Sequence, residues 1–376
     1  MRVPLPPLPV EAAWLRVVEI PLLAPFTTSF GTQTVRRAVL VEVSGAGVDG
    51  VGECAAGIEP AYSAETAAGA LEVLRSHLIP AVLAQPPATV DEQVGRWAWI
   101  RGHNMAKAAL EMALLDQAGR ALGRSLGEIL GAGRARIACG VSIGIQPSLA
   151  ATLDLIDGYV AQGYRRIKLK CRPGYDRQLL EAVRPRFPET PVMLDANSAY
   201  TLKDLELLRS LDQFQLMMIE QPLGHDDLVD HARLQGEIAT PVCLDESVES
   251  LADFMAAVAL GSGRILNIKP GRVGGLLPAV SLHDAGVAAG WPVWCGGMLE
   301  TGIGRAANLA LAGLPGFTLP GDTSASDRYF ARDLLVEPFA LAADGTMAVP
   351  TGPGLGIEID PRRLEEVTLS REQVPV

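Results

Sequence analysis

Arg166-Ile-Lys-Leu-Lys170 is the first of five short apolar segments that each end in an ionisable residue. The other four are Pro191-Val-Met-Leu-Asp195, Leu216-Met-Met-Ile-Glu220, Pro241-Val-Cys-Leu-Asp245 and Ile265-Leu-Asn-Ile-Lys269. Successive segments end 25, 25, 25 and 24 residues apart, which is the length that a strand, a helix and two short loops require. Such units close into a β/α barrel whose strands all end at one mouth. We therefore expect the five terminal residues to meet in one small volume.

The chain is long enough for more than this barrel. At 376 residues it exceeds the usual size of one domain, ~150 residues. We expect an α+β capping domain over residues 1–130, the barrel over 131–330, and a tail over 331–376 that packs back on the capping domain. A solenoid would also have a regular period, but consensus repeats are absent. The expected capping-domain strands are 13–22, 37–43 and 50–54, its helices are 64–78, 90–100 and 104–122, and barrel strands one, seven and eight are expected near 139–143, 292–295 and 317–319.

Composition excludes several classes of partner. The net charge of −11 and the isoelectric point near 5.0 argue against binding to nucleic acid or to an anionic membrane. The sequence has no apolar run long enough to span a bilayer, and its proline-rich start lacks the apolar core of a signal peptide. The five cysteines form neither a paired framework nor a Cys-x-x-Cys motif, so we expect buried free thiols and a cytoplasmic protein.

Lysine is rare and is concentrated in the apolar segments. Only five of the 32 basic residues are lysine, at positions 107, 168, 170, 203 and 269. Side chains alternate along a strand, so Lys168 and Lys170 are expected on one face, about 7 Å apart. Two neighbouring ammonium groups beside a cation would lower a lysine pKa towards neutrality and favour proton transfer. The alternative is that these lysines only form ion pairs with the nearby acids.

Asp195, Glu220 and Asp245 are candidate metal ligands. Three hard oxygen ligands on adjacent strands suit octahedral Mg²⁺, for which Mn²⁺ can substitute. The alternative is three acids that neutralise three lysines, but gathered carboxylates favour a cation. Asn197 and Glu246 are expected to support these ligands or to serve in turns, and capping of the next helix is an equal alternative for Asn197. A metal that chelates a carboxylate would stabilise the enediolate formed when an amine removes the α-proton.

Several longer motifs resemble the enolase superfamily, in its muconate-lactonizing subgroup. They are Asp195-Ala-Asn197, Ile219-Glu220-Gln-Pro222, Asp245-Glu-Ser247, the Lys-x-Lys pair and the helix around 107–116. The o-succinylbenzoate synthase/N-acylamino acid racemase branch is more narrowly indicated by Asn267-Ile-Lys-Pro-Gly-Arg-Val-Gly-Gly275, Trp294-Cys-Gly-Gly-Met-Leu-Glu-Thr-Gly-Ile-Gly-Arg305 and Leu319-Pro-Gly-Asp-Thr-Ser324. The resemblance covers essentially the whole chain and implies a modified TIM barrel, (β/α)7β, with an α+β capping domain built from the N-terminal region and the C-terminal tail.

The resemblance also assigns roles to residues. It implies that Lys170 is the base, with Lys168 beside it, and that Mg²⁺ binds to the three acids. In the synthase reaction, a step of menaquinone biosynthesis, Lys269 would stabilise the intermediate as a cation and the neighbouring hydroxyl would leave. In racemisation, Lys170 and Lys269 would exchange protons with opposite faces of the α-carbon. Arg272 is carried by racemase-competent members and is expected to tune Lys269; a surface salt bridge is the alternative.

Substrate contacts are expected from the loops at the mouth. The glycine-rich segment with Gly297 and Met298, together with Gly302 and Gly304, offers backbone N–H groups, which the resemblance places against the distal succinyl or acyl group rather than a phosphate. Loop aromatics and a residue at the end of strand one are further candidates: Phe26, Phe30, Tyr62 and Ser142. For each aromatic residue, a place in the core is an equal alternative.

Other activities fit the sequence less well. Mandelate-racemase chemistry would need a His–Asp dyad on later strands, and dipeptide epimerases carry Asp-x-Asp where this chain has Pro320-Gly-Asp-Thr. Muconate cycloisomerase is a weaker alternative, and a non-catalytic binding protein would be expected to have lost one of the six lysine and acid positions. We expect a homo-oligomeric enzyme that acts on a small-molecule carboxylate. The sequence leaves a synthase and a dedicated N-acylamino acid racemase undecided, because both use the same six groups.

Overall fold

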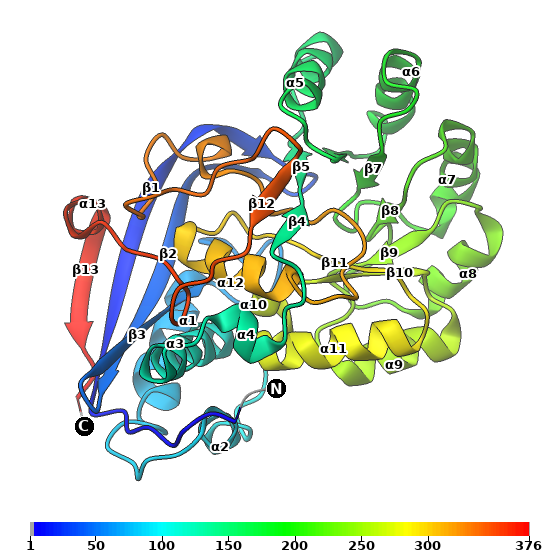
Figure 1. Ribbon diagram of the computed structural model, residues 1–376. Helices are drawn as coiled ribbons and strands as arrows, with labels where there is room; N and C mark the ends of the chain where they lie inside the picture. The colour runs from blue at the N-terminus through cyan, green and yellow to red at the C-terminus, as the bar shows by residue number, and fades with distance from the viewer. Residues whose placement is uncertain (1–3, 376) are drawn as a thin grey trace.

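The five apolar segments lie side by side in one parallel sheet. The computed structural model describes residues 4–375, and its seven-stranded sheet has the order β5-β6-β7-β8-β9-β10-β11, with parallel neighbours throughout. The strands are β5 (Gly140–Ile143), β6 (Arg166–Lys170), β7 (Val192–Asp195), β8 (Ile219–Glu220), β9 (Val242–Leu244), β10 (Ile265–Ile268) and β11 (Val293–Cys295). Each strand pairs with its neighbour in sequence, and the sheet curls into a barrel (Figure 1).

The segment that closes the barrel differs from the prediction. Residues 317–319 were expected to be an eighth strand, but they form only isolated parallel bridges: Phe317 pairs with Val293 of β11, and Gly321 pairs with Cys139 next to β5. Gly316, Pro320 and Gly321 interrupt this stretch. Proline lacks the N–H that a regular ladder needs, and glycine weakens a strand. The barrel is thus closed by single bridges rather than by a full strand.

Helices cover the outside of the barrel between successive strands. They are α5 (Leu149–Ala161), α6 (Asp176–Arg186), α7 (Leu205–Ser210), α8 (Val229–Glu237), α9 (Leu251–Leu260), α10 (Pro270–Val273), α11 (Leu276–Ala288) and α12 (Gly302–Ala312), with short 3₁₀ turns at Leu202–Asp204, Leu211–Phe214 and Ser326–Arg328. Two serines start helices as side-chain caps: Ser148 Oγ accepts from Ala151 N at 3.2 Å, and Ser250 Oγ accepts from Asp253 N at 3.2 Å.

The capping domain is an antiparallel sheet backed by helices. Its strands β1 (Ala12–Thr27), β2 (Thr32–Gly45), β3 (Val48–Cys54) and β13 (Thr368–Gln373) have the order β13-β1-β2-β3. The C-terminal strand β13 pairs with β1, so the tail completes this sheet, as expected. The helices are α1 (Ala67–Val73), the π-helical turn Leu74–Leu78, α2 (Val90–Arg96), α3 (Asn104–Leu122) and α4 (Leu126–Leu130), and a small ribbon pairs β4 (Arg136–Ala138) with β12 (Thr346–Ala348). The domain boundaries at residues 130 and 330 stay predictions.

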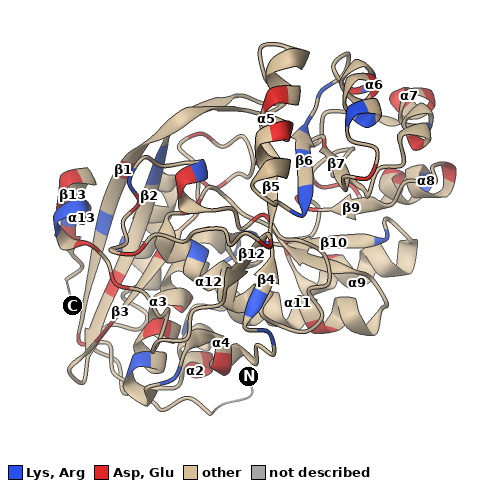
Figure 2. Cartoon of the chain, turned by 45° about the horizontal axis from the view of Figure 1, so that its top comes forward, with Lys and Arg blue, Asp and Glu red and all other residues tan. Residues whose placement is uncertain are grey.

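An apolar layer fills the inside of the barrel beneath the strand ends. Met193, Met218, Cys243, Ile265 and Trp294 pack together there. All five cysteines are free and buried, as the sequence predicts. Figure 2 shows the basic residues of β6 among the barrel strands, whereas most other charged residues lie on helices and loops. None of the helices within residues 4–375 has the length and apolar character needed to cross a membrane.

Candidate active site

The register of the parallel strands brings the ionisable residues to one level. Lys170 lies opposite Asp195, and Asp195 lies opposite Glu220. Asp245 follows β9 directly, and Lys269 follows β10. All five residues are buried. The sequence spacing therefore predicted correctly that these side chains converge at the C-terminal ends of the barrel strands.

Lys168 lies at the centre of an ion-pair cluster. Its Nζ is 3.0 Å from Asp195 Oδ2, 3.0 Å from Glu220 Oε2 and 2.7 Å from Asp322 Oδ2. The Trp294 ring lies beneath, with its centroid 5.1 Å from the same nitrogen. Lys168 thus joins the acids at the ends of β7 and β8 to Asp322, which follows the bridge that closes the barrel.

Asp322 was not among the predicted site residues. Besides Lys168, it pairs with Arg166 Nη1 at 2.7 Å and accepts from Ser142 Oγ at 3.3 Å. The only sequence signal was an acid just after the predicted eighth strand. Because the Asp322 carboxylate faces two cations, its pKa lies well below the usual range despite burial.

Lys170 is held by residues of the barrel. Its Nζ donates to Asp195 Oδ2 at 2.6 Å and to Asn197 Oδ1 at 2.7 Å. Asn197 in turn donates through Nδ2 to Glu246 Oε1 at 2.9 Å. The capping alternative for Asn197 is wrong, because Thr201 caps the following helical turn. Asn197 instead lines the cavity and links Lys170 to Glu246.

Lys269 has a partner from the capping domain. Its Nζ donates to Asp245 Oδ2 at 2.6 Å and to the Tyr62 hydroxyl at 3.1 Å, and it lies 4.4 Å from the centroid of the tyrosine ring. The Tyr62 hydroxyl also donates to Asp245 Oδ1 at 2.8 Å. Tyr62 therefore contacts both Lys269 and Asp245 at the mouth of the barrel.

Arg272 is buried beneath Lys269, so the alternative of a surface salt bridge is wrong. Its guanidinium pairs with Asp245 Oδ1, donates to the Val248 carbonyl at 2.8 Å, and also bonds to the Asn267 carbonyl. The residue thus fixes the carboxylate that holds Lys269.

Carboxylates favour the charged form of two of the lysines, Lys168 and Lys269. Burial disfavours the charged form of Lys168, but Asp195, Asp322 and Glu220 overcome this effect and hold its pKa well above the usual value. Burial opposes the charge on Lys269 too, and Asp245 again raises the pKa. The expectation that neighbouring ammonium groups lower a lysine pKa concerns Lys168 and Lys170 beside a cation. At Lys168 the carboxylates act in the opposite direction, and the expectation for a cation-bound site stays a prediction.

The acids differ among themselves. Burial, reinforced by Asp195, raises the pKa of Glu220 to about 8. Burial, reinforced by Asp245, raises the pKa of Glu246 to about 7. Asp245 is buried as well, but Lys269 and Arg272 hold its pKa far below the usual value. Carboxylates gathered closely enough to raise one another's pKa are a site that a cation would stabilise.

A divalent cation fits the donor chemistry of this site. Asp195, Glu220 and Asp245 offer hard oxygens, and the buried Glu246 Oε2 has no hydrogen-bond partner within the described chain. As the side chains stand, no three acidic, histidine or cysteine groups of residues 4–375 are placed to hold an ion, because lysines bond to the carboxylate oxygens. A bound cation would have to replace some of these lysine contacts. The metal ligands therefore stay a prediction.

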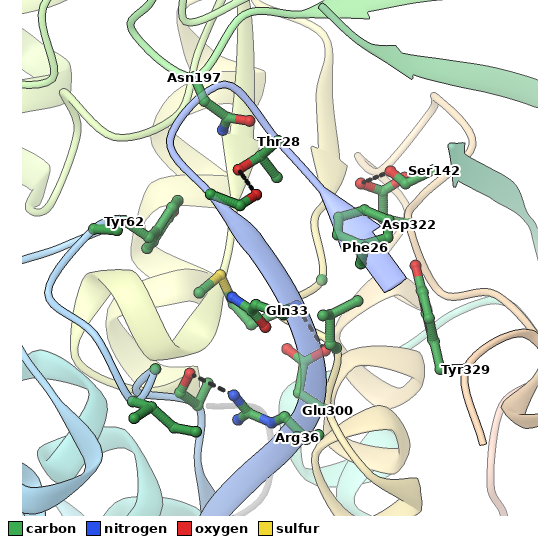
Figure 3. Close-up of a pocket in the computed structure, with 18 of the residues that line it drawn as sticks. Phe26, Thr28, Gln33, Arg36, Tyr62, Ser142, Asn197, Glu300, Asp322 and Tyr329 are labelled. Atoms are coloured by element: carbon green, nitrogen blue, oxygen red, sulfur yellow. Dashed lines mark hydrogen bonds between the residues drawn. The ribbon is translucent and has the colours of Figure 1, made fainter. Parts of the chain in front are cut away.

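A cavity of about 330 Å³ connects these groups to the capping domain. Lys168, Lys170 and Lys269 lie on its wall, as do all six predicted substrate contacts: Phe26, Phe30, Tyr62, Ser142, Gly297 and Met298. Phe26 is mostly buried and packs edge-on against Tyr329, whereas Phe30 is 38% exposed. The loop of the capping domain between β1 and β2 crosses this pocket (Figure 3). The volume of the cavity suits a small organic substrate.

The N–H groups of Gly302 and Gly304 do not face this cavity as substrate contacts. Gly302 N donates to Asp333 Oδ1 at 2.9 Å, and Gly304 N donates to Glu53 Oε2 at 2.9 Å. Both are thus already satisfied by buried carboxylates of the chain, so the prediction that they contact the distal end of the substrate is wrong. The prediction missed this because neither acid is near these glycines in sequence.

Two family models match the chain. Residues 151–363 match the "Enolase C-terminal domain-like" model, and residues 12–131 match the "Mandelate racemase / muconate lactonizing enzyme, N-terminal domain" model. The N-succinylamino acid racemase of Amycolatopsis is 51% identical, covering 95% of this chain and 97% of that protein. The o-succinylbenzoate synthase of Geobacillus stearothermophilus is 50% identical, covering 96% of each.

More distant relatives and solved structures agree with these matches. The crystal structure of an enolase-superfamily member from Listeria innocua is 42% identical with a TM-score of 0.94, covering 98% of this chain and 99% of that one. A chloromuconate cycloisomerase of Pseudomonas putida is only 25% identical, over 96% of this chain and 99% of that protein. The relatives named racemase and synthase thus have much higher sequence identity to this chain than the relative named cycloisomerase.

Proposed function

The chain belongs to the mandelate racemase/muconate lactonizing group of the enolase superfamily, and on that premise we propose that it is an o-succinylbenzoate synthase that also racemises N-succinyl and other N-acyl amino acids. The observation that carries this proposal is a pair of lysines, Lys170 and Lys269, on the wall of one cavity and paired with acids on different strands. Enolase-superfamily sites use a lysine or histidine base together with Mg²⁺.

The synthase reaction requires one base and one leaving group. Its substrate is 2-succinyl-6-hydroxy-2,4-cyclohexadiene-1-carboxylate. Lys170 would take the proton from the carbon that bears the carboxylate and would then give it to the hydroxyl of the neighbouring carbon, which would leave as water from the same side and yield the aromatic ring. Lys269 would remain protonated and would face the ring as a cation.

Racemisation requires two bases. One lysine would remove the α-proton of the N-acyl amino acid, and the other would return a proton to the opposite face. Both lysines form a short bond to an acid, Lys170 to Asp195 and Lys269 to Asp245, at 2.6 Å in each case. The same site therefore supports either reaction, and the substrate decides whether a hydroxyl is present to leave.

The metal of this proposal is Mg²⁺, with Mn²⁺ as a substitute. Asp195, Glu220 and Asp245 would hold it, and when bound it supplies positive charge that makes the α-proton of a carboxylate easier to remove. Asn197 and Glu246 would support this arrangement through the bond from Asn197 Nδ2 to Glu246 Oε1.

A dedicated N-acylamino acid racemase is the second candidate. The buried contact between Arg272 and Asp245 favours it, because it fixes the carboxylate that holds the second lysine. Muconate cycloisomerase is a third and weaker candidate, since the relative of that kind is distant.

Steady-state assays of the purified protein with the cyclohexadiene substrate and with N-succinyl amino acids test the proposal. We expect turnover of both, since the two reactions use one site. Turnover of N-acyl amino acids alone would favour the dedicated racemase. Failure with both substrates in the presence of Mg²⁺ would contradict the proposed function.

A further inference from the structure

A carboxylate of the capping domain lies at the start of a barrel helix. Glu53, next to the end of β3, is buried, and it accepts from Thr301 N at 3.1 Å to each oxygen, from Thr301 Oγ1 at 2.7 Å and from Gly304 N at 2.9 Å. These donors are the N-cap and first-turn groups of α12, which lack partners within their own helix. The oxygens of Glu53 therefore occupy the place of a bound anion at this helix start.

The place is one where β/α barrels often bind the anion of a ligand. α12 follows β11, the seventh strand of the sheet, and phosphate sites in these barrels lie at the loops after the seventh and eighth strands. Here the chain supplies its own anion. Arg36 Nη2 lies 3.7 Å from Glu53 Oε1 and balances its charge. A Cβ at position 304 would lie 2.8 Å from Glu300 Cβ and Cγ and 3.1 Å from Glu53 Oε2, so the glycine permits the close approach of both residues.

The contact joins segments that line the substrate cavity. Glu53 precedes the segment 55–62, and Thr301 follows the segment 297–300; both segments line the cavity. Arg36, from β2, donates to the carbonyls of Cys54 at 3.3 Å and Ala55 at 3.3 Å. In Figure 3, Arg36 and Glu300 lie at the same end of the pocket, away from Asn197 and Ser142. A shift of Glu53 would therefore move both walls together.

We propose that Glu53 is a positioning residue that fixes the two walls of the substrate pocket relative to each other by filling the anion site at the start of α12. It touches neither the lysines nor the predicted metal ligands, so it acts through the segments 55–62 and 297–300. The expected effect on substrate binding rests on the proposed function, whereas the effect on the two segments does not.

Hydrogen–deuterium exchange of the full-length protein tests the positioning directly. Glu53→Gln keeps the size of the side chain but removes the charge and replaces one acceptor with a donor that faces N–H groups. We expect faster amide exchange in both segments, 55–62 and 297–300. The matched control is Asp116→Asn, because Asp116 is also buried and accepts from Val51 N of the same strand and from Leu355 N, away from the pocket.

Kinetics and anion rescue provide the second measurement. We expect Glu53→Gln to raise KM for N-succinyl amino acids about fivefold or more while kcat changes less than about threefold, since binding geometry and not the proton-transfer groups is altered. Glu53→Gly leaves room for a small anion, so sodium formate, but not sodium chloride at equal ionic strength, should lower KM and slow the exchange in both segments.

Either of two exchange results would overturn the proposal: unchanged exchange in both segments of Glu53→Gln, or the same increase in Asp116→Asn. Equal effects of formate and chloride on Glu53→Gly would also overturn it, because the helix start would then not be an anion site. If the wild-type protein turned over neither substrate, the proposed function would fail, while the exchange measurement would still decide the role of Glu53.

Discussion

The two lysines of the site are held by different parts of the molecule. Among the residues that the structure describes, Lys170 bonds to Asp195 and Asn197, which both belong to the barrel. Lys269 bonds to Asp245 of the barrel and to Tyr62 of the capping domain. The repeated geometry of the barrel therefore places two similar lysines, but only Lys269 also depends on a residue of the capping domain for its position.

The chain just after Lys269 also depends on the capping domain. Asn104 Nδ2 donates to the Arg272 carbonyl at 2.8 Å, and Glu111 accepts from the N–H groups of Leu276 and Leu277 at the start of α11. Since racemisation needs both lysines as proton carriers, we expect it to respond to the capping domain more strongly than the synthase reaction does.

Removal of the divalent metal should have the largest effect, because it affects both lysines alike. Treatment with EDTA is expected to reduce synthase and racemase activity to background, and Mg²⁺ should restore both. Mg²⁺ should also raise the Tm of the chelated protein, since a ligand of the native state stabilises it. Full activity after exhaustive chelation would contradict the metal site.

Loss of Lys170 should disable both reactions. Lys170→Ala removes the base, and we expect kcat for each to fall by about 10²–10⁴-fold. Retained Tm, measured by circular dichroism, would show that the fold survives. Synthase activity within about tenfold of the wild type, well short of the loss of about 10²-fold or more that removal of a base causes, would mean that another group removes the proton.

A charge-preserving change at Lys269 should separate the two reactions. Arginine keeps the positive charge but does not give up its proton, so Lys269→Arg should lower racemisation about 100-fold or more and the synthase reaction much less. Lys203→Arg is the matched control, because Lys203 is an exposed lysine outside the cavity. Equal losses in both reactions would contradict the different roles of Lys269.

A smaller effect is expected at the capping-domain partner of Lys269. Tyr62→Phe removes the hydroxyl that bonds to Lys269 and Asp245 but keeps the ring. Loss of a hydrogen bond worth about 1 kcal/mol should lower the rate of racemisation about fivefold, with a smaller effect on the synthase reaction. A larger loss in the synthase reaction would contradict the dependence of Lys269 on the capping domain.

The smallest expected effect is on how protein stability depends on pH. It concerns Glu111 of the capping domain, which bonds to the start of α11. Burial raises the pKa of Glu111 from 4.5 to about 8, despite bonds from the N–H groups of Leu276 and Leu277. Because the folded protein holds this proton more tightly than the unfolded chain, the contribution of Glu111 to stability is fully present below pH 4.5 and is lost as the pH rises through about 8.

Urea unfolding across this pH window measures the effect. The free energy of unfolding of the wild type, relative to Glu111→Gln, should fall between pH 4.5 and about 8. Identical pH slopes for the two proteins would contradict a buried, proton-binding Glu111.

The sequence predicts the site best where regular geometry places residues. Spacing alone brings Lys170, Asp195 and Glu220 together, because parallel strands in register align their ends. Residue spacing does not predict contacts that are made by segments without regular secondary structure. Asp322 follows a segment that forms isolated bridges instead of a strand. Its carboxylate contacts Lys168 across the place where these bridges close the barrel.

Charge state is the other part that sequence reasoning could not supply. The spacing of Lys168 and Lys170 on one strand suggested that the two ammonium groups would act on each other. Three carboxylates of Asp195, Glu220 and Asp322 lie within 3.0 Å of the Lys168 nitrogen and outweigh that effect. Such distances depend on side-chain positions across the barrel, which residue spacing does not encode.

Enantiomer-resolved incorporation of solvent deuterium at the α-carbon of an N-succinyl amino acid, followed by NMR with Lys269→Ala, is the most direct test of two lysines that serve opposite faces. We expect no interconversion and deuterium in one enantiomer only, the one whose α-proton faces Lys170. Incorporation into both enantiomers at equal rates would contradict the assignment of one lysine to each face.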